Sequence, residues 1–213
     1  MSIRPVRTVS RCVFSAVVLT GVLAGVPAQA EPQEFSFKDP KGVNGVVFVM
    51  ESRLEPIVGM IGGVGGQVIY DPEKPEELRG EVTIDLGQLS LINPAMTKVL
   101  RGGDWLDISE RFVVSMNFTG VESADAGEEG VAALQANAML HFGEQQAQLT
   151  LPVEATYLED AAEQRGAGKG DLLVLRSMFK LDRIEHLGIK PDQPTDKVGQ
   201  EIMVMVPIVG YSK

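Results

Sequence analysis

The side chains best suited to proton transfer or metal binding in this sequence are its two histidines, His141 and His186. They are far apart and belong to no H-x-x-H or H-E-x-x-H spacing, so they form no metal-binding motif. His186 lies four residues after Asp182, and such a pair could supply a base and an orienting carboxylate to an isomerase or hydrolase. A single histidine on a strand or loop is more often structural than catalytic, so we favour a structural role for His186 over an isomerase or hydrolase site.

Other motifs of catalysis are missing from the sequence. It has no G-x-S-x-G serine motif, and the glycine-rich residues 62–66 lack the lysine and hydroxyl residue that end a phosphate-binding loop. Adjacent carboxylates at residues 76–77 and 128–129 lie in polar turns, where solvation explains them. We therefore predict a protein that is not an enzyme, with no catalytic residue, no metal and no cofactor.

The first 30 residues have the three regions of a secretory signal peptide. A basic start is followed by an apolar stretch over residues 13–26 and an A-x-A cleavage site at residues 28–30. The basic residues are Arg4, Arg7 and Arg11. The apolar stretch is too short to span a membrane, so we predict a cleaved signal peptide over residues 1–30 and no stable membrane insertion afterwards. An uncleaved anchor is the alternative. The expected location is periplasmic or secreted.

Residues 31–213 then form one domain of ordinary size. Cys12 is the only cysteine and would be removed with the signal peptide, which excludes a disulfide framework and a thiol nucleophile. Removing three arginines and no acidic residue lowers the formal net charge of −10 by three, to −13. A chain this acidic is not expected to bind nucleic acid or anionic lipid head groups through its overall charge.

The mature chain alternates between strand and turn patterns almost throughout. Residues 81–86, for example, place three apolar side chains on one face and three polar ones on the other. The expected strands are residues 46–50, 60–70, 81–86, 112–121, 131–142, 146–158, 172–183 and 201–211. Asn93 and Pro94 suit the cap and first position of a short helix that runs to Leu100. We predict an all-β fold: an eight-stranded antiparallel barrel, which leaves no exposed sheet edge, with a short helical insertion.

Several of these strands are apolar on both faces. An eight-stranded barrel can be filled by side chains or can hold one slender ligand, and methionines spread over different strands could line such a cavity. Residue types alone favour a filled core. If a ligand binds, alternation within the strands predicts that it contacts Phe48, Met50, Val82, Ile84, Phe112, Val114, Met116, Phe118, Phe179 and Met205.

The segment over residues 96–108 and the strand after it resemble the signature of the YceI-like family. The positions that match are Leu100, Asp104, Trp105, Leu106, Asp107 and Phe118. Met96, Thr97 and Val99 stand where the family usually has Arg, Asp and His. Residues 80–86, 148–153, 179–183, 187–189 and 198–202 are similar to further motifs of the family, in the same order.

Members of that family are secreted, lipocalin-like barrels that enclose a long isoprenoid lipid. The resemblance therefore implies a lipocalin-like barrel that binds a polyprenyl chain or an isoprenoid quinone, as an exported carrier or storage protein. The alternative is a barrel with a filled core that works as a stress-related or partner-binding module without lipid. An isoprenoid lipid is the expected partner, and a homodimer is compatible with the sequence.

Overall fold

The computed structural model describes residues 32–51, 53–54, 56–103, 105–108, 112–128, 130–189 and 198–212. The predicted signal peptide lies outside the described residues, and so does Asp104 of the family pattern. In the part of the chain that is described, no helix is both long enough and apolar enough to cross a membrane.

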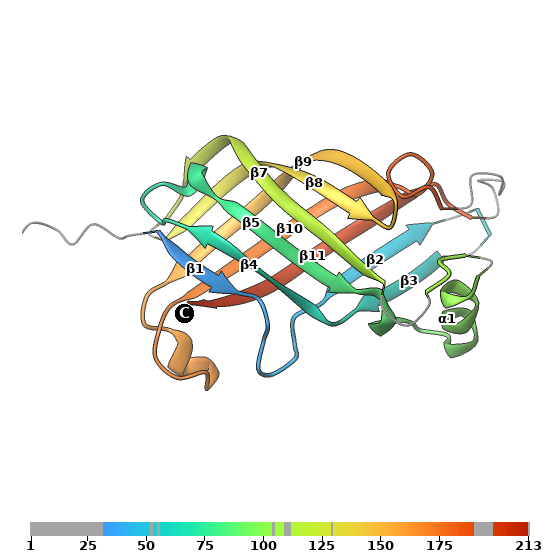
Figure 1. Cartoon of the computed structure of the whole chain (residues 1–213), viewed down its shortest axis with the longest axis horizontal. Coiled ribbons are helices and arrows are strands. Elements are labelled where there is room, and N and C mark those ends of the chain that lie inside the picture. The colour runs from blue at the N-terminus through green and yellow to red at the C-terminus, as the bar shows by residue number, and fades with distance from the viewer. Residues whose placement is uncertain are drawn as a thin grey trace, which may run out of the picture.

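Eight antiparallel strands close into a barrel, which confirms the predicted fold (Figure 1). In order around the wall they are β1 (Gln33–Ser36), β4 (Val64–Tyr70), β5 (Arg79–Asp85), β7 (Val113–Ala126), β8 (Val131–Phe142), β9 (Gln145–Leu158), β10 (Leu172–Asp182) and β11 (Glu201–Ser212). Closure comes from β1, which pairs with β4 on one side and with Ser212 and Tyr211 of β11 on the other.

Three further strands lengthen the wall at one end of the barrel. They are β2 (Val46–Glu51), which pairs with β11, then β3 (Pro56–Ile61) and β6 (Leu89–Leu91). The sequence predicted one strand over residues 60–70, but the structure has β3 and β4, separated at Gly62 and Gly63. Gly63 has a φ of +64°, and the bend there lets the chain leave β2 and pair with β1 and β5 instead.

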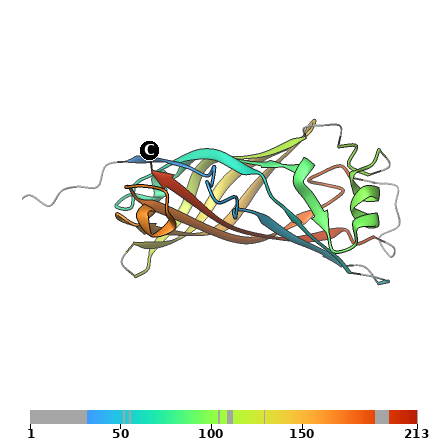
Figure 2. The same cartoon turned by 90° about the horizontal axis from the view of Figure 1, so that it is seen from below.

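The helix α1 (Pro94–Arg101) lies across the end of the barrel that β2, β3 and β6 extend (Figures 1 and 2). As predicted, Asn93 caps it, since the side-chain oxygen accepts a hydrogen bond from the Ala95 N–H at 2.9 Å. Short 3₁₀ turns, η1 (Pro75–Glu77), η2 (Leu86–Gln88) and η3 (Ala162–Arg165), complete the connections.

Side chains fill the opposite end of the barrel, near β1. Five large residues there are at most 2% exposed and belong to the main hydrophobic core. They are Phe35, Phe37, Tyr70, Leu134 and Leu173. On β8 the inward positions between them are small, with Ala136 and Ala138 completely buried, so the aromatic rings from β1 and β4 have room. We call this part the solid half.

Asn44 bonds to the backbone of β11 between the stretch that pairs with β1 and the stretch that pairs with β2. Backbone pairing of β11 with β1 covers Tyr211 and Ser212, and pairing with β2 covers residues 202–205. Between them, the buried Asn44 amide donates to the Val209 oxygen at 2.8 Å and accepts from the Val209 N–H at 2.9 Å. A side chain thus stands in for a missing strand partner.

Candidate functional site: an apolar cavity beneath α1

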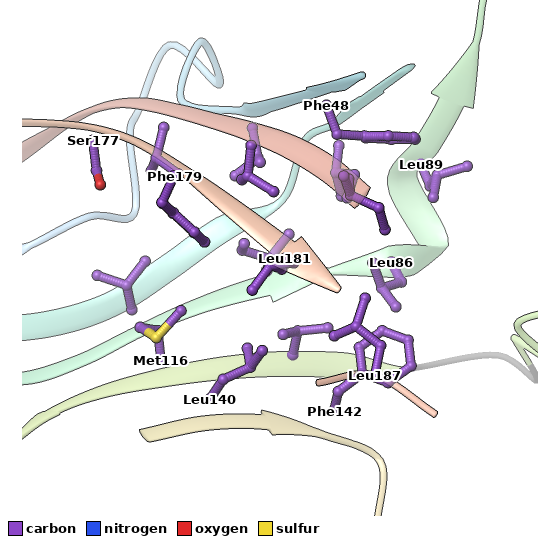
Figure 3. A pocket seen from close by; sticks show the side chains of 18 of the residues that line it. Phe48, Leu86, Leu89, Met116, Leu140, Phe142, Ser177, Phe179, Leu181 and Leu187 are labelled. Atoms are coloured by element: carbon purple, nitrogen blue, oxygen red, sulfur yellow. The ribbon is translucent and has the colours of Figure 1, made fainter. Parts of the chain in front are cut away.

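The half of the barrel nearest α1 is hollow. Its cavity has a volume of about 180 Å³, many times the roughly 10–15 Å³ that one water molecule needs, so it is far larger than a packing defect. Side chains from β2, β5, β7, β8, β10 and β11 point into it, among them Phe48, Met116, Leu140 and Phe179 (Figure 3). The surface that the lining residues turn toward the cavity is entirely apolar.

The cavity does not extend into the solid half, because none of the five large residues there is part of the lining. Along β11 the lining runs over alternate residues from Ile202 to Ile208, which is about 20 Å of strand. The site is therefore a deep, narrow, apolar space that is closed at one end.

Eight of the ten predicted contact residues line the cavity. They are Phe48, Met50, Val82, Ile84, Val114, Met116, Phe118 and Phe179. Phe112 is not part of the lining: it precedes β7 and packs edge-to-face on Phe142, with 5.1 Å between ring centroids. It therefore supports the wall, because Phe142 is the ring that faces the cavity. Contact of any of these residues with a ligand stays a prediction.

The expectation for Met205 was wrong. Its neighbours Val204 and Val206 line the cavity, so Met205 points outward and is 42% exposed. On the outer wall it lies opposite Met178 of β10 and Val47 of β2. Because β11 is apolar on both faces, its alternation could not show which face is inward.

Strand alternation also missed the residues that cover the cavity at the α1 end. They come from α1 and the loop after it, and from the turn after β10: Leu100, Trp105, Leu106, Leu187 and Ile189. Backbone bonds hold the first loop against the helix, with the Leu106 N–H donating to the Leu100 oxygen at 3.2 Å. All five residues lie in segments that match the family pattern, so the family resemblance could have indicated them. Strand alternation could not, because these residues lie in a helix, a loop and a turn.

Arg183 is the charged residue of the lining, and it is only 1% exposed. Its guanidinium donates to backbone oxygens, from Nε to Gly199 at 3.0 Å and from Nη1 to Ile189 at 2.7 Å. Burial lowers the pKa of Arg183, and the nearby Asp182 charge opposes this shift. The guanidinium thus holds together the two chain segments that flank residues 190–197.

Asp182 and His186 hold the turn after β10 in shape. The His186 Nδ1 accepts a hydrogen bond from the Asp182 backbone N–H at 3.0 Å, while the carboxylate accepts from the Ile184 N–H at 2.8 Å and from Gln200 Nε2 at 2.6 Å. Burial would raise the pKa of Asp182, but the hydrogen bonds that its carboxylate accepts from Glu185, Gln200 and Ile184 bring it below the usual value. Both side chains therefore stabilise the turn. His141 lies on an outward position of β8, since the lining residues Leu140 and Phe142 flank it.

The sequence pattern of the YceI-like domain matches residues 39–209, which is most of the chain. The chain belongs to the YceI-like family. Among curated proteins, no sequence matches it. This YceI-like domain is nevertheless similar in structure to several solved proteins.

Three of these structures show how far the likeness extends. BcnA of Burkholderia cenocepacia has a TM-score of 0.61 and 18% identity, and the match covers 78% of this chain and 95% of that one. The YceI protein of Campylobacter jejuni has a TM-score of 0.57 and 11% identity over 73% and 84%. A polyisoprenoid binding domain from Saccharophagus degradans, implicated in plant cell wall breakdown, has a TM-score of 0.59 and 8% identity over 86% and 100%. At these identities the likeness establishes the shared fold.

Proposed function

We propose that this YceI-like domain binds one long isoprenoid lipid, a polyprenyl chain or an isoprenoid quinone, in the cavity beneath α1. The observation that carries the proposal is the cavity itself: deep, narrow, apolar on all its lining surface and closed by the solid half. Each methylene buried there is worth roughly 0.8 kcal/mol, so a long apolar chain can bind tightly with few hydrogen bonds. The S. degradans domain of the same fold, described as polyisoprenoid binding, supports this choice of ligand.

The role we propose is that of a carrier or store outside the cytoplasm. It rests on the basic, apolar and A-x-A regions of the first 30 residues, which are typical of a signal peptide. Binding, rather than catalysis, is the proposed activity, because the side chains of Asp182 and His186 are used by the turn after β10. A homodimer stays a prediction.

Two neighbouring residues of β11 allow a matched test of the cavity. Val206 lines it and Met205 lies outside, so a tryptophan at either position adds similar bulk on opposite faces of one strand. Purified protein would be titrated with a short-chain isoprenoid quinone, followed by ligand co-elution and the rise in Tm. We expect wild type and Met205→Trp to bind, and Val206→Trp to lose at least tenfold in affinity.

The proposal fails if wild-type protein neither co-elutes with the quinone nor gains thermal stability from it. Equal loss in both variants would place the binding outside the cavity. Mass spectrometry of lipids extracted from the exported protein then identifies the natural ligand.

A further inference from the structure

The outer side of α1 is apolar although it faces solvent. Ile92, just before the helix cap, is 84% exposed, and Val99, two turns later, is 59% exposed. Ala95 lies between them along the helix and is exposed as well. Leu100, on the other side of the same helix, lines the cavity. The element that covers the cavity thus presents apolar side chains on both of its faces.

Charge distinguishes this end element from the rest of the chain. Residues 86–103 contain two charged side chains, Lys98 and Arg101, and both are basic, although Asp85 precedes this stretch and Asp107 lies in the loop after α1; the chain as a whole has a formal charge of −10. Both lie in the last turn of α1, within one turn of Val99. Arg101 donates to the Leu89 oxygen, which fixes it beside the cavity, while Lys98 is exposed. An exposed apolar pair flanked by cations suits the boundary between acyl chains and anionic head groups.

We propose that the outer side of α1 docks reversibly on a lipid bilayer that contains anionic lipids, with the cavity end of the barrel toward the membrane. Ile92 and Val99 enter the acyl boundary, and Lys98 lies among the phosphates. A bilayer fits this surface better than a second copy of the chain, because the area that two side chains can bury is far below the roughly 800 Å² per partner of a stable protein interface. Docking by α1 does not depend on the proposed cargo, but it would let an apolar cargo pass between membrane and cavity without crossing water.

Vesicle flotation of the mature protein tests the proposal without any cargo. The vesicles would be phosphatidylcholine alone, or phosphatidylcholine with about a third phosphatidylglycerol, at low salt. We expect stronger binding to the anionic vesicles, a loss of about tenfold in the variant Ile92→Ser/Val99→Ser, and a loss of about fivefold in Lys98→Gln on anionic vesicles only.

The matched control is Met178→Ser/Met205→Ser, which removes two exposed apolar side chains from the outer barrel wall. It should keep the wild-type affinity within a factor of two. All variants should melt as wild type does, since the substituted residues are exposed.

The proposal is overturned if wild-type protein binds neither kind of vesicle, or if the methionine variant loses as much binding as the α1 variant. A protein that docks but takes up no quinone would refute the proposed function alone. One that takes up quinone but does not dock would refute this inference alone.

Discussion

Arg183 is the largest side chain that is fully buried in the described part of the protein, and it donates hydrogen bonds to the backbone oxygens of Gly199 and Ile189. Replacing Arg183 with Met keeps much of the side-chain volume but leaves those backbone oxygens without this hydrogen-bond donor. We expect Arg183→Met to lower the free energy of unfolding by about 3 kcal/mol, measured by urea denaturation. The control Arg176→Met breaks only an exposed ion pair with Glu154 and should cost less than about 1 kcal/mol. Equal losses would contradict the structural role of Arg183.

Gly59 leaves space for a ring of the cavity wall. A Cβ added at this position would lie 2.4 Å from the Phe48 Cζ and 2.6 Å from the Leu91 Cδ2, so Gly59→Ala must displace both side chains, and the Phe48 ring borders the cavity. We expect a modest loss of stability, about 1–2 kcal/mol, together with weaker quinone binding. Gly120→Ala is the control, because a Cβ there would meet no atom within 4 Å. Unchanged quinone binding in Gly59→Ala would show that Phe48 moves away from the cavity.

At the scale of elements, the barrel depends on one side chain where two strands separate. Asn44→Ala removes the donor and acceptor that Val209 uses. We expect a loss of about 1–3 kcal/mol, and amide hydrogen exchange at Val209 should accelerate more than at residues paired by backbone alone. Asn137→Ala, which loses a more exposed bond with Thr150, is the control and should cost less. Unaltered exchange at Val209 would refute the role of Asn44.

Strands whose two faces differ in polarity could be predicted from the sequence, whereas the bounds and inner faces of uniformly apolar strands could not. Residues 131–141 alternate between buried and more open positions, and the predicted strand over residues 131–142 matches β8. The division at Gly62 and Gly63 was hidden, because apolar residues continue on both sides and only the change of pairing partner separates β3 from β4. Strand alternation correctly identified eight residues of the cavity lining. It assigned Met205 to the inner face of β11 although this side chain points outward, because a strand that is apolar on both faces does not show which face is inward.

At the scale of the whole molecule, buried hydroxyl and carboxyl groups set the pH range of stability. Burial and the Asp71 charge raise the pKa of Tyr70 to about 12, and burial with the hydrogen bond to Asp171 raises that of Tyr157 to about 12. A raised folded pKa stabilises the protein fully below the ordinary value of 10, and that contribution is lost as pH rises toward 12. We expect Tm to fall over this interval, and Tyr70→Phe to reduce the fall.

At acid pH, the dependence of stability on pH has the opposite sign. Burial would raise the pKa of Asp39, but hydrogen bonds from Val43, Lys41 and Tyr211 and the Arg165 charge lower it overall. A lowered folded pKa stabilises the protein above the ordinary value of 3.8, and that contribution disappears as pH falls through the folded value. Asp39→Asn should therefore lower Tm at neutral pH and flatten the acid limb of a Tm profile. An acid limb identical to that of wild type would contradict this assignment.

The division of the barrel into a solid and a hollow half bears on how such proteins diversify. Phe35, Tyr70 and Leu173 hold the fold together at one end, while Val114, Met116 and Val206 shape the space at the other. Substitutions among the second group change the volume and outline of the cavity without unpacking the first. If the cavity holds a lipid as proposed, a lineage could exchange one lipid for another through single substitutions in the cavity wall that each leave a folded protein, because the residues that shape the cavity are not those that pack the solid half.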